Sequence, residues 1–276
     1  MSFEYNYLDL VRRAYKTGES RNSRVGPTHQ LFGTHLVIPK VWASFPILTT
    51  RQVFYKGVLG ELAAFLRGAE DLATFKELGC NYWDANAAAW DVNTGLSPKD
   101  YIVGRVYGAQ WKNWTDGAGS LNQIKALVHG LKADPNGRRH LLTTYNPAEV
   151  HLGCLPPCHL LAQFNVHGAA LDCMVTMRSV DLCLGLPADI ILYAVLLILV
   201  ARATRKVAGT LSFSMGDTHV YDNHADAFLD KQALREPLEL PTWSLALEST
   251  LDNFEPKHVT LNNYKHGPRI DYALNV

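Results

Sequence analysis

A chain of 276 residues, 47% of them hydrophobic, can bury a large core, so we predict a globular protein with a single domain over residues 1–276. Lysine plus arginine equals aspartate plus glutamate at 26 each, which gives the chain no general attraction to nucleic acid or to an anionic membrane. Any anion that it binds must be held by local arginines. The first residues lack the basic start and apolar core of a signal peptide, so we expect a cytoplasmic protein.

Helical and strand-like patterns alternate along the chain, without repeats or a proline-rich linker. Helical spacing of apolar residues covers residues 5–16, 55–67, 72–78 and 121–132. Strand-like runs cover residues 139–145, 159–166, 170–179 and 210–221, and His167-Gly168 marks a hairpin-like turn. These elements predict the α+β class, with a mixed sheet and a central helix.

The most apolar stretch is IILYAVLLILVA, residues 190–201, which lies between Asp189 and Arg202. Its twelve residues are too few for a membrane-spanning helix, which takes about 20 residues. The stretch follows Pro187, a residue that interrupts helices, and it is apolar on all faces. We therefore predict a buried helix at the centre of the fold, with Asp189 near its N-cap.

The five cysteines are scattered and odd in number, which indicates reduced thiols rather than a disulfide framework. Cys158 is notable because it follows two prolines and precedes His159. It could be a packing residue, a metal ligand or a nucleophile. For a metal site, Cys154-x3-Cys158-His159 lacks a second pair of ligands at finger-like spacing.

A second loose set of possible metal ligands is Asp217, His219 and His224. His219 shares a strand face with Tyr221, whereas His224 lies beyond the turn-prone Asp222-Asn223. Neither this set nor the one around Cys158 makes a convincing metal centre, so we predict no metal.

Two pairs of residues could hold a phosphate. Arg138 and Arg139 follow an Asp-Pro-Asn-Gly turn, and Arg178 with Ser179 stands at a strand end. A guanidinium and a hydroxyl both donate hydrogen bonds to phosphate oxygens. Taken alone each pair is weak, because solvated arginines at a turn are common.

Several segments together resemble the thymidylate synthase and deoxycytidylate (dCMP) hydroxymethylase family: LPPCH, QF, MRSVDLCLGLPADI, YA and GDTHVYDNH, with GELAAFLRG, WD, VYGAQW and DPNGRR upstream and HGPRIDYALNV at the end. The resemblance covers essentially the whole chain, and so many motifs in register are far more specific than one. It implies a thymidylate synthase-like fold, in which a mixed β-sheet is flanked by helices and holds a buried central helix.

The resemblance also implies catalytic roles. Cys158 resembles the nucleophile that adds to C6 of a pyrimidine nucleotide, which requires a thiolate. Arg178 matches the residue that touches both this cysteine and the phosphate, and a nearby guanidinium favours the thiolate. Glu61 resembles the carboxylate that organises waters near the base, Tyr107 resembles the residue near the C5 proton-abstraction path, and His159 matches the histidine beside the nucleophile. The remaining cysteines, Cys80, Cys154, Cys173 and Cys183, are interpreted as inert.

Nucleotide contacts follow from the same resemblance. Arg24, rather than Arg21, would bind phosphate with Arg178 and Ser179, while Arg138 and Arg139 would reach across a homodimer interface into the partner's site. The other positions implied in nucleotide binding are Gln163, Asp181, Asp189, His219 and Tyr221, of which His219 and Tyr221 would contact the sugar 3′-hydroxyl.

Asp189 indicates the base. Thymidylate synthases carry asparagine here, which pairs with uracil, whereas the family enzymes that act on cytidylate carry aspartate. A carboxyl group accepts from the N4 amino group of cytosine and can share a proton with N3. We therefore predict dCMP as the substrate, although the same aspartate could also serve as a helix N-cap.

The implied one-carbon donor is 5,10-methylenetetrahydrofolate, used as a cosubstrate. Asp181 and Gly185 match pterin contacts, Trp83 and Leu155 match apolar walls, and Arg51 replaces a lysine near the glutamate tail. Asn86 and Ala188 stand where tryptophan and phenylalanine are common, which predicts a more open cleft.

An open cleft favours water over hydride as the group that completes the reaction, so we predict a dCMP hydroxymethylase. A dCMP 5-methyltransferase, a dUMP-specific thymidylate synthase and a non-catalytic nucleotide- or RNA-binding relative stay open as alternatives. An enzyme that modifies dCMP would suit a bacteriophage that modifies its DNA.

Overall fold

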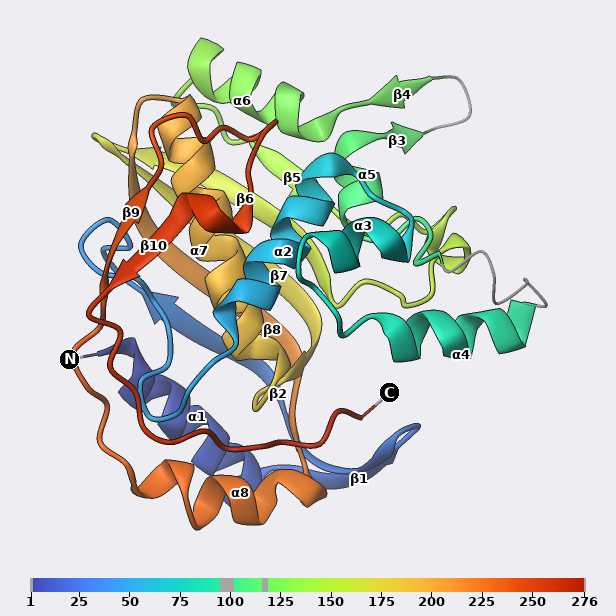
Figure 1. The fold of residues 1–276 in the computed structure, drawn as a ribbon, viewed down its shortest axis with the longest axis vertical. Helices are drawn as coiled ribbons and strands as arrows, with labels where there is room; N and C mark the ends of the chain where they lie inside the picture. Colours follow the sequence, from blue (N-terminus) through green and yellow to red (C-terminus); the bar gives the residue numbers. More distant parts are fainter. Residues whose placement is uncertain (1, 95–101, 116–118, 276) are drawn as a thin grey trace.

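The computed structural model describes residues 2–94, 102–115 and 119–275 (Figure 1). The helices are α1 Phe3–Thr17, α2 Tyr55–Arg67, α3 Leu72–Glu77, α4 Asp84–Thr94, α5 Gly108–Lys112, α6 Gln123–Ala133, α7 Gly185–Ala203 and α8 Ala225–Leu229. The strands are β1 Glu19–Ser23, β2 Gly26–Ile38, β3 Trp114–Thr115, β4 Ser120–Leu121, β5 Leu141–Thr143, β6 His159–His167, β7 Ala170–Asp181, β8 Val207–Tyr221, β9 Thr242–Leu245 and β10 Val259–Asn262. The α+β class is confirmed.

One six-stranded sheet, in the order β1-β2-β8-β7-β6-β5, forms the centre of the fold. Its neighbours pair antiparallel except β7 and β8, which are parallel. Parallel pairing needs a crossover connection, and α7 supplies it between these two strands. The predicted mixed sheet with a central helix is therefore confirmed, and Figure 1 shows α7 lying along the sheet with α2 in front of it.

The central helix is longer than its sequence indicated. It begins at Gly185, so Pro187 lies in its first turn, where the missing N–H costs no hydrogen bond. Asp189 is therefore inside the helix, and the predicted N-cap role is wrong because Leu184 holds that position. The Asp189 carboxyl therefore does not cap the helix.

With 19 residues and a mean hydropathy of 2.1, α7 is long and apolar enough to cross a membrane by length and composition. The apolar run itself has twelve residues, as the prediction stated, but the helix that contains it is longer than the run. However, 78% of the helix window is buried inside the protein, so its composition is accounted for by packing in the core.

The two faces of the sheet differ. A row of paired residues on one face, Leu36, Phe213, Val175, Ala162 and Leu142, is buried. The adjacent row on the other face runs through Val37, Ser212, Met174, Gln163 and Leu141, and its three apolar members are between 41% and 52% exposed. Helix α7 covers the first face, so the second face presents mixed apolar and polar side chains to the outside.

The β6–β7 hairpin and most helices agree with the sequence prediction. Gly168 has a φ of 60° in the tight turn between His167 and Ala170, a conformation that glycine adopts without strain. Helix α2 has the predicted bounds, and α1, α3 and α6 differ by one or two residues at their ends. The sequence prediction missed the β1–β2 hairpin, α4, and the strands β9 and β10.

Candidate active site

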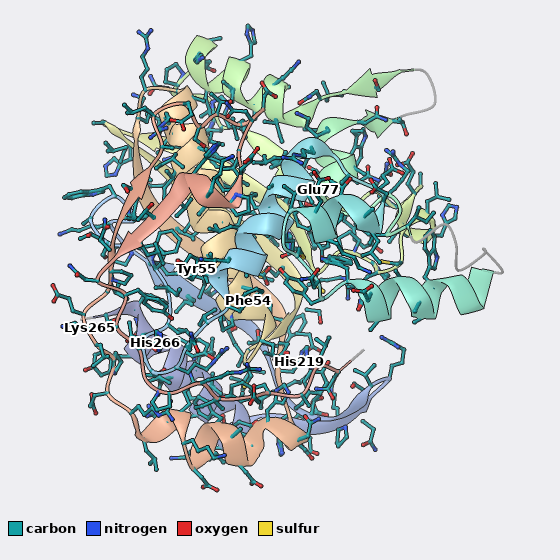
Figure 2. The ribbon with its side chains drawn as sticks, viewed as in Figure 1. Phe54, Tyr55, Glu77, His219, Lys265 and His266 are labelled. Atoms are coloured by element: carbon teal, nitrogen blue, oxygen red, sulfur yellow. The ribbon has the colours of Figure 1, made fainter. Side chains whose placement is uncertain are left out.

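A cleft of about 920 Å³ opens where the first turns of α7, the end of β7 and the start of β6 approach α2. It is also lined by residues 269–272 and 274 of the C-terminal segment, and Phe54 and Tyr55 at the start of α2 lie on its wall (Figure 2). The predicted catalytic residues that line it are Glu61, Tyr107, Cys158, His159 and Asp189, and all predicted folate contacts do so too: Arg51, Trp83, Leu155, Asp181 and Gly185. A second cavity of about 370 Å³, between α6 and the end of α7, contains none of the predicted residues.

Cys158 is held by its backbone at the mouth of this cleft. Its amide donates to the Tyr107 hydroxyl at 2.9 Å, and its carbonyl accepts from the Arg178 amide at 2.8 Å. Burial raises the pKa of the Cys158 thiol, the Arg178 charge lowers it, and Asp189 raises it. The Arg178 charge therefore opposes the effect of burial on the pKa of the thiol. This is the effect expected of a residue that assists thiolate formation.

The Arg178 guanidinium also fixes the turn before the nucleophile. Nε donates to the carbonyl of Pro157 at 2.8 Å, and Nη2 donates to the carbonyl of Pro156 at 2.6 Å. These two hydrogen bonds give the carbonyl groups of both prolines a partner and attach the turn to the arginine. Arg178 itself is exposed and does not line the cleft, but it lies beside Cys158 as predicted.

Tyr107 has a strained backbone. Its φ of 30° lies in a region that costs a non-glycine residue about 1–3 kcal/mol. The ring is stacked between Phe65, at a centroid distance of 5.0 Å, and His159, at 4.1 Å. This packing holds the Tyr107 hydroxyl against the Cys158 amide, which preorganises the nucleophile.

His159 is a neutral side chain. Burial lowers its pKa to about 3, so it carries no charge at physiological pH. Nδ1 is 2.7 Å from the Tyr193 hydroxyl, and Nε2 is 3.6 Å from Oδ1 of Asp189. The ring therefore links Tyr193 of α7 with the Asp189 carboxyl group.

The surroundings of Asp189 favour the protonated form of its carboxyl group. Its side chain is 16% exposed, and burial raises its pKa well above the ordinary range, with the charges of Glu61 and Asp181 adding to the effect. A protonated carboxyl offers one donor and one acceptor. It can thus present a hydrogen-bonding edge to a planar base next to Cys158.

Glu61 is the second buried carboxyl of the cleft. Tyr82 donates to Oε2 at 2.8 Å and Trp83 Nε1 donates to Oε1 at 2.7 Å. Burial raises the pKa of Glu61 to about 7, and these two hydrogen bonds oppose the rise. Tyr82 was missed by the sequence prediction, and the only signal was its position next to Trp83.

The predicted folate side of the cleft combines apolar walls with charged groups. Trp83 is 6% exposed, and Leu155 also lines the cleft. Asp181 accepts from the amides of Cys183 and Leu184 at 2.8 and 3.3 Å. Arg51 is 5% exposed, because Nη2 donates to the Cys183 carbonyl at 2.6 Å.

The Arg51 guanidinium also lies 5.2 Å from the centre of the Tyr272 ring. It therefore joins the turn before α7 to the C-terminal segment, and its role near a glutamate tail stays a prediction. Exposed cations at the rim of the same cleft are Lys56 and Arg269.

Several predicted nucleotide contacts lie near the C-terminal end of β8, an interior strand of the sheet. Arg24 is in the β1–β2 turn. Its charge lowers the pKa of Tyr221, against the dominant effect of burial, which raises that pKa to about 12. His219 (Figure 2) is 2.8 Å from Asp217, which pairs with Ser179 on β7. Arg21, the alternative to Arg24, is paired with Glu19.

Asp181 and Asp189 are the predicted nucleotide contacts that line the cleft, and the others do not: Arg24, Arg138, Arg139, Gln163, Arg178, Ser179, His219 and Tyr221. Arg138 and Arg139 are exposed between α6 and β5, and neither lines the cleft of its own chain. Gln163 lies on the outer face of the sheet, beside Leu141 and Met174. The arginines remain predicted contacts of a partner's site, and a nucleotide role for Gln163 has no support from its position.

The possible metal ligands regroup. His224 lies not with Asp217 and His219 but with Asp181 and Cys183, whose ligand atoms are within 4.8 Å of its own. The Arg51 guanidinium is close enough to this group to lower the pKa of Cys183, against the dominant effect of burial, which raises it. A positive charge at this place disfavours a cation, so no step of the chemistry below is assigned to a metal.

The chain resembles known proteins over almost its whole length. Residues 5–276 match the family model described as thymidylate synthase. The chain is 38% identical, over 289 aligned residues and 99% of its length, to the bifunctional dihydrofolate reductase-thymidylate synthase of Leishmania amazonensis, and the protein of the same name from Leishmania major matches equally. The alignment spans 55% of each relative, so the chain covers about half the length of the curated relatives that it matches. Neither name bears on a bacteriophage source or on DNA modification.

Proposed function

Because the chain belongs to the thymidylate synthase family, we propose that it transfers a one-carbon unit to C5 of a pyrimidine nucleoside monophosphate. Its substrate is dCMP, and its product is 5-hydroxymethyl-dCMP. The observation that carries this proposal is the buried Asp189 carboxyl, whose pKa is raised by burial, in the cleft that Cys158 also lines.

The first step is addition of the Cys158 sulfur to C6 of the base. The thiol loses its proton, and Arg178 favours the resulting thiolate. The Tyr107 hydroxyl and the Arg178 amide hold the cysteine backbone during the attack. Electron density displaced by the new S–C6 bond moves through C5 toward the C4–N3 edge of the base.

Asp189 receives that density through the cytosine edge. Its carbonyl oxygen accepts from the N4 amino group, and its hydroxyl donates to N3. Because burial keeps the acid protonated, it can transfer the proton fully to N3 as charge develops there. An asparagine has no such proton to give, and uracil already carries one at N3.

The folate cosubstrate fits the other half of the cleft. Apolar Trp83 and Leu155 suit a planar ring system, the Asp181 carboxylate suits a pterin edge, and Lys56 with Arg269 suits an anionic tail. When bound, 5,10-methylenetetrahydrofolate supplies the carbon that becomes an exocyclic methylene on C5 of the nucleotide. Water on this methylene gives the hydroxymethyl product, and Ala188 leaves room for water near it.

We further propose that the protein acts as a homodimer. The outer face of the sheet exposes Val37, Met174 and Leu141 in one row, which suits a second copy. Arg138 and Arg139 lie outside their own cleft, as residues donated to a partner's phosphate site would. A fully active monomer in sedimentation experiments would contradict this proposal.

Thymidylate synthesis from dUMP is the second candidate. It is favoured by the names of the two Leishmania relatives. A protonated Asp189 can also donate to O4 of uracil and accept from its N3–H, as an asparagine does. What separates the candidates is the proton transfer to N3, which only cytosine can accept.

The deciding experiment incubates the protein with methylenetetrahydrofolate and dCMP, CMP or dUMP, and identifies each product by mass. We expect 5-hydroxymethyl-dCMP from dCMP and little product from dUMP. Formation of dihydrofolate, followed by absorbance, would instead reveal a methyl product. Turnover of dUMP alone would refute the proposed substrate, and binding without any turnover would favour a non-catalytic relative.

A further inference from the structure

We propose that Tyr82 is a positioning residue that holds the Glu61 carboxylate as the base for water attack on the C5 methylene. This inference rests on the proposed hydroxymethylation and names the group that activates the water. Tyr82 touches Glu61 rather than the nucleotide in this structure, so it acts through the carboxylate.

The geometry fixes both oxygens of Glu61. Tyr82 and Trp83 are adjacent in the segment before α4, and each donates to a different carboxylate oxygen, at 2.8 and 2.7 Å. The two donors therefore prevent rotation of the carboxylate and leave acceptor capacity on each oxygen. All three side chains line the cleft together with Cys158, so a water in the cleft can reach this carboxylate.

Glu61 is matched to this role by its surroundings. Burial brings its pKa to about 7, so that it is partly ionised at neutral pH, and a base works best with a pKa near the working pH. His159 is too weak a base at a pKa of about 3, and burial holds Asp189 and Tyr107 in their protonated forms.

The charged and titratable neighbours of Glu61 are few among the described residues. Tyr82 and Cys80 precede α4, Tyr107 precedes α5, and Asp189 is on α7. None of these is a cation, so the carboxylate form of Glu61 depends on its two hydrogen-bond donors. Loss of the Tyr82 hydroxyl should therefore raise the pKa of Glu61 further.

The step is balanced without an external oxidant. The water oxygen forms a bond to the methylene carbon, and one water proton passes to Glu61. The electron pair of the C5-methylene double bond moves to C5 and then forms the C5–C6 double bond. The C6–S bond breaks, and Cys158 leaves as a thiolate that can take the proton back by way of solvent.

The test compares Tyr82→Phe with Tyr5→Phe. Tyr5 also donates to a glutamate, Glu236 at 3.0 Å, but on the exposed surface of α1 far along the chain from the cleft residues, which makes it a matched control. With dCMP tritiated at C5, tritium release counts the methylene intermediates formed, and product analysis counts how many are hydrated. Tritium release and product are both measured from pH 5.5 to 9, a range that includes the Glu61 pKa of about 7.

In the wild type, the ratio of hydroxymethyl product to tritium released should rise with pH. For Tyr82→Phe we expect this rise to occur about one pH unit higher, so that the ratio recovers at the alkaline end. Tyr5→Phe should match the wild type. An unchanged pH profile in Tyr82→Phe would overturn the inference. A wild type that forms only methyl product would instead refute the proposed hydroxymethylation.

A direct reading guards against a variant that folds poorly or turns over slowly. The ¹³C shift of the Glu61 carboxyl, assigned with Glu61→Gln, is titrated in the wild type and in Tyr82→Phe. A higher pKa in Tyr82→Phe supports the inference, and an equal pKa overturns it. If Tyr82→Phe does not fold, Tyr82→Met, which removes the hydroxyl and offers no hydrogen-bond donor, takes its place with the same expectations.

Discussion

The two walls of the cleft each carry a buried carboxyl group, and the two groups are held differently. On the α2 wall, Glu61 receives hydrogen bonds from Tyr82 and Trp83, and its pKa is about 7. On the α7 wall, the Asp189 carboxyl lies 3.6 Å from Nε2 of His159, and its pKa is raised well above the ordinary range. Burial is the leading cause of the raised pKa at both; hydrogen-bond donors oppose the rise at Glu61, whereas the charges of Glu61 and Asp181 add to it at Asp189.

This difference assigns two roles to two similar side chains. A carboxyl that ionises near neutral pH can accept a proton, and one that stays protonated can donate. Glu61 is thus suited to activate water, and Asp189 is suited to read cytosine and protonate N3. Substitutions of Cys158, of Glu61 and Asp189 in turn, and of Ala188 test this assignment.

Cys158→Ser should give the largest effect. The hydroxyl is a far weaker nucleophile than the thiolate, so turnover of dCMP should fall by on the order of a thousandfold or more. Both carboxyls remain in place, so dCMP binding by calorimetry should change little. A variant that retains full activity would remove the covalent mechanism.

Glu61→Gln should lower turnover by about a hundredfold or more, since it removes a general base. The sign of the pH dependence is set by the raised pKa of about 7: the base form is missing below that pH and present above it. Wild-type hydroxymethylation should therefore rise with pH through neutrality, and the variant should lose this step. The measurement is the rate of 5-hydroxymethyl-dCMP formation at saturating substrate against pH; a persisting transition near pH 7 would assign it to another group.

Asp189→Asn should change the choice of base. The amide can pair with either base by exchanging the places of its oxygen and its nitrogen, but it has no proton to transfer to N3 of cytosine, so the ratio of kcat/KM values should shift by about a hundredfold toward dUMP. The ratio of kcat/KM for dUMP and dCMP measures it. Unchanged base preference would mean that Asp189 does not read the base edge.

The contrast between the two walls was partly predictable from the sequence. Helix α2, which carries Glu61, was predicted to its exact ends because amphipathic spacing runs up to Gly68, and that glycine caps the helix with a φ of 70°. Helix α7 was placed too late, because Gly185 and Pro187 indicate a break while the structure uses both in the first turn. The position of Asp189 inside the helix therefore had to come from the structure.

Contacts between distant segments were beyond the sequence. The hydrogen bond from Tyr82 to Glu61 joins residues 21 positions apart, and it depends on how the chain returns between α3 and α4. The β1 strand was missed because all of its residues are exposed, so that Glu19–Ser23 shows no alternation of apolar and polar side chains. The resemblance identified Cys158 and its neighbours, but it did not indicate that Arg51 would be buried against Tyr272.

Ala188→Phe should give the smallest effect and tests the space between the two carboxyls. Ala188 lines the cleft one residue before Asp189, whereas Asn86, the other departure from the family pattern, lies on α4 and does not line it. A phenyl ring at position 188 should fill part of the cleft, strengthen the apolar wall and hinder water from reaching the C5 methylene. We expect KM for methylenetetrahydrofolate to fall a few-fold, as burial of more apolar surface favours binding, and hydroxymethyl product to fall relative to methyl product. Asn86→Trp is the matched control and should change the product ratio less; an equal change in both variants would show that water reaches the methylene by a path other than the one beside Asp189.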